Sequence, residues 1–79
     1  MPYRTTVSGK HIGCLAGPSA ADFDLYLFRW DGSAWVVAAR SITDGSTESV
    51  NYAGTPGQYY WLVASYRGSG AYTLRTARP

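Results

Sequence analysis

Short apolar runs, each about the length of a β-strand, recur along this chain at intervals of about ten residues. Clusters of Gly, Ser, Asp and Pro separate them, and these residue types favour turns. No segment shows the 3.6-residue period of an amphipathic helix. Strands joined mainly by tight turns pair in antiparallel fashion, because parallel neighbours require long crossover connections. The sequence therefore predicts an all-β fold, a small antiparallel β-sandwich rather than a closed barrel.

The turn residues divide the chain into about six expected strands. In DFDLYLFRW the apolar side chains alternate cleanly between two faces, and Asp31-Gly32 then predicts a hairpin to the next strand. Within the later turn GTPG, Pro56 fixes its own φ and Gly57 is free to adopt a positive φ. The expected strands cover residues 5–15, 22–30, 35–41, 48–54, 58–66 and 71–76.

The chain is short enough that it forms one domain over residues 1–79. Its composition is 46% hydrophobic and 15% charged, well below the usual quarter, which excludes a disordered tail. At 79 residues, burial of apolar surface only narrowly exceeds the loss of chain entropy. Residues 1–4 are expected to be leader or expression-derived residues that precede the fold.

The charge pattern and the apolar pattern exclude several classes of partner. The net charge is +2, and the seven basic residues are scattered rather than clustered, which argues against a nucleic-acid binder. No apolar run is long enough to cross a membrane, so no membrane partner is expected. The opening MPYRTTVSGK lacks the apolar region of a signal peptide.

The residue types that carry catalysis are scarce. The single cysteine, Cys14, forms no internal disulfide and is expected to be a small buried apolar residue. The single histidine, His11, has no motif around it and is expected to have a structural role. No nucleophile motif such as G-x-S-x-G occurs. The chain is therefore predicted not to be an enzyme and to need no cofactor for catalysis.

Four segments together resemble the bacterial pre-peptidase C-terminal domain. They are a D-x-D-L-Y-L strand at 22–27, an E-S-x-x-Y strand at 48–52, a G-x-x-G-x-Y-Y turn and strand at 54–60, and a G-S-G-x-Y-T-L hairpin at 68–74. They stand in the order and spacing of that family and reach from about residue 20 to the end. The opening TTVSGKHIGCLAGPSAADFDLYL is similar to the short version appended to secreted trypsin-like serine proteases of filamentous soil bacteria.

The resemblance implies a jelly-roll-like β-sandwich that follows the catalytic domain of an exported peptidase. It implies a secreted, extracellular, non-catalytic accessory domain, with the parent protease domain as one partner. Assistance in folding or secretion and attachment to insoluble substrate are the two roles that it suggests. The longer members of the family carry extra N-terminal strands with a D-x-Y-x-F motif, and nothing in this sequence matches that motif.

Two carboxylates, Asp22 and Asp24, lie two residues apart on one expected strand and therefore share a face. Like charges at that separation repel, and a Ca²⁺ ion that shared oxygens from Asp31, Asp44 or Glu48 would relieve the repulsion. The alternative is that both are solvated at the start of the strand, or that one caps a turn. A calcium site is thus one of two interpretations.

The strand QYYWLVASY is aromatic on both faces, so its register decides what is buried. We expect Tyr59, Trp61 and Val63 to point inward, because Trp61 is the largest side chain and gains most from burial. Tyr60, Leu62 and Tyr66 then point outward. The rest of the expected core is Phe23, Leu25, Leu27, Val50, Tyr52, Tyr72 and Leu74.

The outward aromatic side chains are the candidate ligand-binding site, for which we select Tyr60, Tyr66, Tyr26 and Arg75. Exposed aromatic rings stack on sugar rings or on proline-rich chains. The predicted ligand is therefore an insoluble or fibrous substrate, either a collagen-like protein or a polysaccharide. Phe28 and either Trp30 or Trp35 are also expected to face outward. Two alternatives remain open: the rings form ordinary cross-strand pairs that cover the sheet face, or the face forms a homodimer.

Overall fold

The computed structural model describes residues 2–43 and 45–79 of the chain. The described residues form strands and turns and no helix, hence no helix that could cross a membrane. This confirms the predicted all-β class. The strands are β1 (Tyr3–Thr5), β2 (Gly9–Ala16), β3 (Asp22–Trp30), β4 (Trp35–Ser41), β5 (Thr47–Gly54), β6 (Gly57–Arg67) and β7 (Thr73–Ala77).

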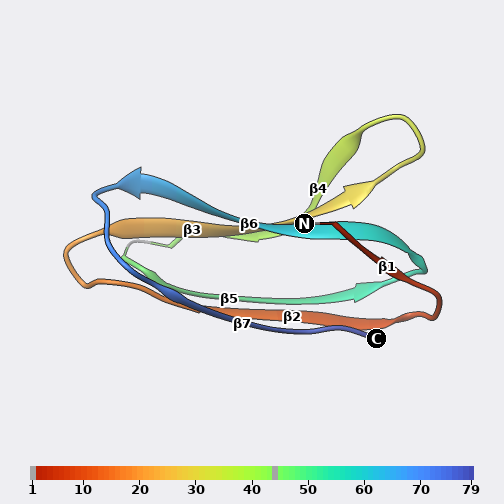
Figure 1. The fold of residues 1–79 in the computed structure, drawn as a ribbon, viewed down its shortest axis with the longest axis horizontal. Helices are drawn as coiled ribbons and strands as arrows, with labels where there is room; N and C mark the ends of the chain where they lie inside the picture. Colours follow the sequence, from red (N-terminus) through yellow and green to blue (C-terminus); the bar gives the residue numbers. More distant parts are fainter. Residues whose placement is uncertain (1, 44) are drawn as a thin grey trace.

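The strands form two antiparallel sheets that lie face to face, as in a β-sandwich (Figure 1). The four-stranded sheet has the order β1-β6-β3-β4, and the three-stranded sheet has the order β5-β2-β7. At one end the β3–β4 hairpin bends away from the three-stranded sheet (Figure 1). The centre of the fold is the pairing of β3 with β6, which extends from Asp22 opposite Arg67 to Arg29 opposite Tyr59.

Most expected strands are found where the alternation was clean, and one is divided. The expected strands 22–30 and 35–41 coincide with β3 and β4. The single expected strand 5–15 is wrong, because the chain crosses from one sheet to the other after Thr5 and so forms β1 and β2. Residues 3 and 4, which were expected to precede the fold, pair with residues 59 and 58 of β6.

The predicted register of β6 is confirmed. Tyr59 is fully buried, and Trp61 and Val63 pack against the core from the inner face of the sheet. On the outer face, Leu62 is 42% exposed and Tyr66 is 77% exposed. The identity of the outward side chains follows from this register, because side chains alternate along a strand.

The core lies between β2, β3, β5 and β6. Leu25, Leu27 and Tyr59 are completely buried, and Leu15 of β2 joins them although it was not on the expected core list. Tyr72, in contrast, was expected in the core but is 50% exposed, because it precedes β7; its ring meets that of Phe23 in a T-shaped contact. The remaining expected core members are buried or pack against the buried cluster: Phe23, Val50, Tyr52, Trp61, Val63 and Leu74.

Aromatic side chains of the four-stranded sheet face glycines of the opposite layer. A Cβ atom added at Gly13 would lie 2.7 Å from the ring of Trp61, and one added at Gly17, just after β2, would lie 2.8 Å from the Cβ of Ser46 and 2.9 Å from the ring of Phe23. A Cβ atom at Gly54 would lie 2.7 Å from the hydroxyl of Tyr59. The two layers therefore fit together as large side chains against bare backbone, and no larger residue fits at these positions without movement of a ring.

Two of the turns that the sequence predicts can be compared with the structure. The β3–β4 hairpin closes as predicted: the carboxylate of Asp31 accepts hydrogen bonds from the amides of Ser33 and Ala34, and Gly32 adopts a positive φ of 105°. Gly57, which was free to adopt a positive φ, does not adopt one. Gly57 is the first residue of β6 and pairs with Thr5, so its backbone is held in the strand conformation.

The contact between Gly13 and Trp61 makes a direct prediction. Gly13→Ala should lower the free energy of unfolding by about 1–3 kcal/mol, because the added methyl group overpacks the indole ring. Urea unfolding measures the loss. The same substitution in a Trp61→Phe background should cost clearly less, since the smaller ring leaves room. Equal costs in the two backgrounds would show that the glycine matters for another reason.

Candidate functional site

The outer face of the four-stranded sheet carries a row of aromatic side chains. The alternation of β3 that buries Leu25 and Leu27 turns Tyr26, Phe28 and Trp30 to this side. Strand pairing then sets Tyr60 of β6 opposite Phe28, and Trp35 of β4 opposite Trp30. We call this surface the aromatic face and define it as Tyr26, Phe28, Trp30, Trp35, Tyr60, Leu62 and Tyr66.

The rings of the aromatic face pack against one another. The rings of Phe28 and Tyr60 are parallel within 5°, with centroids 4.8 Å apart. Trp35 meets Tyr60 edge-on at 4.7 Å, and Trp30 meets Trp35 at 5.4 Å. These are favourable cross-strand aromatic contacts, and each leaves its members half-buried. The row is therefore a connected aromatic surface whose rings support one another, rather than a set of separate flat platforms.

Tyr66 differs from the rest of the face, because no aromatic ring of the described residues packs against it. It borders a shallow hollow of about 330 Å³ that Asp22, Asp24, Tyr26 and Ile42 also line. Leu62 lies four residues earlier on the same outer side of β6. The part of the face most accessible to a ligand is therefore the β6 side, around Leu62 and Tyr66.

The structure brings together three of the four selected ligand residues and separates the fourth. Tyr26, Tyr60 and Tyr66 share the aromatic face. Arg75 lies on β7, which pairs with β2 in the other sheet, and its side chain is on the outer face of that sheet. Its assignment to the same site was wrong. Trp30 and Trp35, which the sequence selection omitted, belong to the face, and their places on both sides of the Asp31-Gly32 hairpin could have indicated it.

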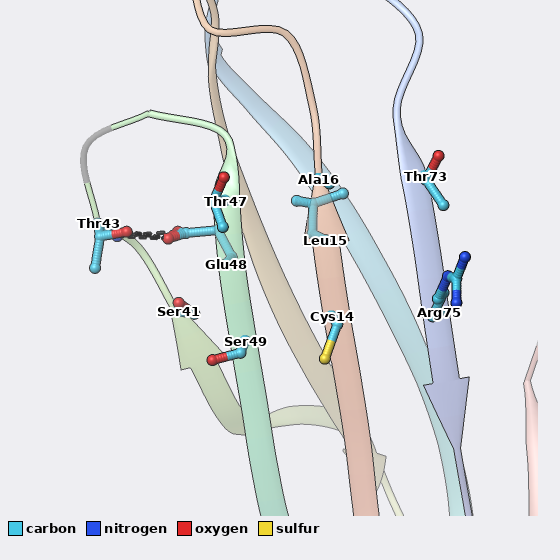
Figure 2. Close-up of a pocket in the computed structure, with 10 residues that line it drawn as sticks. All are labelled: Cys14, Leu15, Ala16, Ser41, Thr43, Thr47, Glu48, Ser49, Thr73 and Arg75. Atoms are coloured by element: carbon cyan, nitrogen blue, oxygen red, sulfur yellow. Dashed lines mark hydrogen bonds between the residues drawn. The ribbon is translucent and has the colours of Figure 1, made fainter.

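Arg75 instead borders a groove of about 420 Å³ over the three-stranded sheet (Figure 2). Cys14 and Ala16 of β2 lie between Ser49 of β5 and Arg75 of β7 (Figure 2). Cys14 is exposed here, so the expectation that it is buried was wrong. The inward positions of β2 are His11, Gly13 and Leu15, and alternation leaves Cys14 on the opposite side.

His11 lies in the interior, next to a cluster of tyrosines. Its Nδ1 is 2.7 Å from the hydroxyl of Tyr3, and its ring centroid is 4.1 Å from that of Tyr59. Nε2 is buried and has no hydrogen-bond partner among the described residues. Burial lowers the pKa of His11 and so favours the neutral ring. Because His11 and Cys14 lie on opposite faces of β2, they cannot form a nucleophile–base pair.

The carboxylates proposed to share a calcium ion are not gathered in one place. Asp31 caps its own hairpin, where hydrogen bonds from the Ser33 and Ala34 amides hold its pKa below the usual value. Glu48 is buried, and its carboxylate accepts hydrogen bonds from the amide and hydroxyl of Thr43 (Figure 2). Asp44 lies outside the described residues. The carboxylates of Asp31 and Glu48 therefore each already have hydrogen-bond partners within the fold.

Asp22 and Asp24 do lie close together. Partial burial, and then the charges of Asp22 and Glu48, raise the pKa of Asp24. Asp22 is buried, and its Oδ1 has no hydrogen-bond partner among the described residues. Those residues contain no group of three or more His, Cys, Asp or Glu side chains that could hold a metal ion. Ca²⁺ takes six to eight oxygen ligands, so the described geometry gives a repulsive pair of carboxylates and not a formed calcium site.

No family model matches the sequence, and no solved structure matches this chain. The resemblance to the pre-peptidase C-terminal domain is thus carried by the four sequence segments alone.

The repulsion at Asp24 makes a prediction of definite sign. Because its pKa is raised, its charged form opposes folding, and this penalty appears as the pH rises from about 3.8 through the folded-state pKa. Asp24→Asn should therefore raise Tm at pH 7 by roughly 1–4 °C and have little effect near pH 3. Asp31→Asn is the control with the opposite sign, because the pKa of Asp31 is lowered. A calcium-dependent rise in Tm that Asp24→Asn abolishes would instead show that the pair binds the cation.

His11 should make the fold sensitive to acid. Its folded-state pKa is lowered, so below about pH 6.5 the unfolded chain takes up a proton that the folded chain does not. The free energy of unfolding should fall between pH 7 and pH 5 by up to about 1.4 kcal/mol per pH unit. Urea midpoints across this range measure the slope. His11→Gln should remove most of it whatever its effect on overall stability, and an unchanged slope would assign the acid sensitivity to other groups.

Proposed function

We propose that this protein is a non-catalytic binding module that holds an insoluble polymer against its aromatic face. The observation that carries the proposal is the exposure of Leu62 and Tyr66 beside a connected row of half-buried aromatic rings. Large apolar side chains that are exposed to water raise the free energy of an isolated domain. Grouped on one sheet face, they are typical of an interaction surface.

The chemistry of the face favours a long, mostly uncharged polymer. Aromatic and aliphatic side chains offer contact area to the apolar faces of sugar rings or to proline rings, and the tyrosine hydroxyls add hydrogen bonds. An extended sheet face can contact several repeats of a chain, which compensates for a weak contact at each repeat. A collagen-like protein and a polysaccharide both have these properties, and the binding assay separates them.

The resemblance to the pre-peptidase C-terminal domain supplies the biological setting of this proposal. In that setting the domain is secreted with a bacterial peptidase and acts outside the cell. Attachment to insoluble substrate would raise the local concentration of the catalytic domain at its target. The module would contribute binding, and the peptidase domain would contribute the chemistry.

A second candidate function is assistance in folding or secretion, without a ligand. The mutual stacking of Phe28, Tyr60 and Trp35 favours it, because rings that cover one another already serve the domain itself. Deletion of this domain from the parent peptidase separates the two. Loss of secreted yield at unchanged specific activity indicates the folding role, and normal yield with activity lost only on insoluble substrate indicates the binding role.

The binding proposal predicts which substitutions matter. Tyr66→Ala should weaken retention on the bound polymer about twofold to tenfold, since an exposed aromatic contact contributes roughly 0.5–1.5 kcal/mol. Arg75→Ala is the matched control: it removes an exposed side chain from the opposite side of the sandwich and should leave retention unchanged. Pull-down on collagen, keratin, chitin and cellulose, with protein at about 100 μM, measures the effect.

Tyr66 contributes little to the core, so the variant should melt with the wild type and the comparison should report binding alone. Failure of the wild-type domain to be retained on any of the four polymers would remove the binding proposal. Equal losses for Tyr66→Ala and Arg75→Ala would move the binding surface away from the aromatic face.

A further inference from the structure

One edge of β6 is largely uncovered. Along one side, β6 pairs with β3 from Tyr59 to Arg67. Along the other side it pairs only with the short strand β1, at residues 57–59. In the part of the chain that the structure describes, no strand lies against this second side from Tyr60 to Arg67. This stretch, which we call the free edge of β6, presents backbone donors and acceptors to solvent.

From Tyr60 to Ser65 the free edge lacks the usual protection of an edge strand. Charged side chains, prolines and bulges normally discourage pairing with another chain. From Tyr60 to Tyr66 the sequence is YWLVASY, with no charge and no proline. The register shift in the β3–β6 pairing lies at the far end, beyond Ser65. The edge strands β4, β5 and β7 each contain a charged residue, namely Arg40, Glu48 and Arg75, whereas the one charged residue of the free edge is Arg67 at its end.

Beneath the free edge, the space between the two sheets is open. A groove of about 360 Å³ is lined by Tyr3, Trp61, Leu74, Thr76 and Arg78. Trp61 and Leu74 point inward, yet they are only half-buried, whereas Leu25 and Tyr59 are fully buried. The core is therefore complete at its centre and incomplete on this side, where one more strand would cover it.

We propose that the free edge of β6 binds an extended peptide segment as an added antiparallel strand. A row of alternating N–H and C=O groups matches another extended backbone, which favours a peptide over a sugar chain or a lipid as the occupant. The added strand would lie in line with β1, which already pairs with β6 in this direction. Its alternate side chains would enter the groove, and an apolar one would pack on Trp61 and Leu74.

The charges around the groove select the kind of peptide. Arg78 lines one end, with its guanidinium carbon 4.9 Å from the centroid of the Tyr3 ring, and Arg67 lies at the other end of the free edge. No Asp or Glu of the described residues lines the groove. An apolar peptide with acidic residues at both ends is therefore the complementary partner.

The same charges argue against a second copy of this chain as the occupant. Antiparallel pairing of two β6 strands would bring Arg67 of one copy toward the Trp61 end of the other, where Arg78 lies. Like charges would meet at both ends of such a pairing. The positive charges that favour an acidic peptide therefore disfavour pairing of the free edge with a second copy of the chain.

The test uses a capped peptide, Glu-Thr-Thr-Thr-Val-Thr-Leu-Glu, and a second peptide with Lys in place of both Glu residues. Amide chemical shifts of the ¹⁵N-labelled protein measure binding. The acidic peptide should shift the amides of residues 60–66 and slow the hydrogen exchange of alternate ones, which face the added strand. The basic peptide should bind at least threefold more weakly. The acidic peptide with Pro in place of Val should not bind, because Pro disrupts the strand.

Charge reversal at the groove gives the decisive comparison. Arg78→Glu should reverse the preference, so that the basic peptide binds more tightly than the acidic one. Arg75→Glu makes the same change of charge on the outer face of the other sheet and should leave the preference as it is. Three results would overturn the proposal: no shift in residues 60–66 at about 1 mM peptide, shifts confined to the outer face of the sheet, or a concentration-dependent dimer that buries residues 60–66. None of these results depends on whether the aromatic face binds a polymer.

Discussion

The contact of three aromatic rings with three glycines of the opposite layer is the constraint on which the rest of the sandwich depends. Trp61, Tyr59 and Phe23 fill space that Gly13, Gly54 and Gly17 leave empty. Because Tyr59 and Trp61 must point inward, the alternation of side chains along β6 fixes which side chains point outward. The aromatic face and the half-open side of the core are therefore two consequences of one packing solution.

The sequence predicted those features whose signals are local. The clean alternation of β3, the Asp31-Gly32 hairpin and the inward register of Trp61 all follow from a few neighbouring residues and were confirmed. The predictions that failed depended on which strands pair across the fold. Arg75 was placed in the wrong site because β7 pairs with β2, and that pairing spans about 60 residues of chain. The division of residues 5–15 into β1 and β2 carries no proline or charge cluster to mark it.

Cys14 and Gly57 show how tertiary context overrides the tendency of a residue type. Free cysteines are usually buried, yet Cys14 alternates with His11 and Leu15 and so lies on the outside of β2. Glycines after proline often adopt a positive φ, yet the pairing of Gly57 with Thr5 keeps it extended. In both cases a strand pairing fixes the residue more strongly than its own preference does.

The contact between Arg78 and the ring of Tyr3 has a consequence for how such a domain is carried by a longer polypeptide. It holds the first strand and the residue that follows the last strand at the same place on the surface. A domain whose chain enters and leaves at one point can be inserted into a longer polypeptide with little separation added between the segments before and after it. The same proximity makes the fold a candidate for circular permutation, with a short linker across this contact and a new opening at an exposed loop such as Asp31–Ala34.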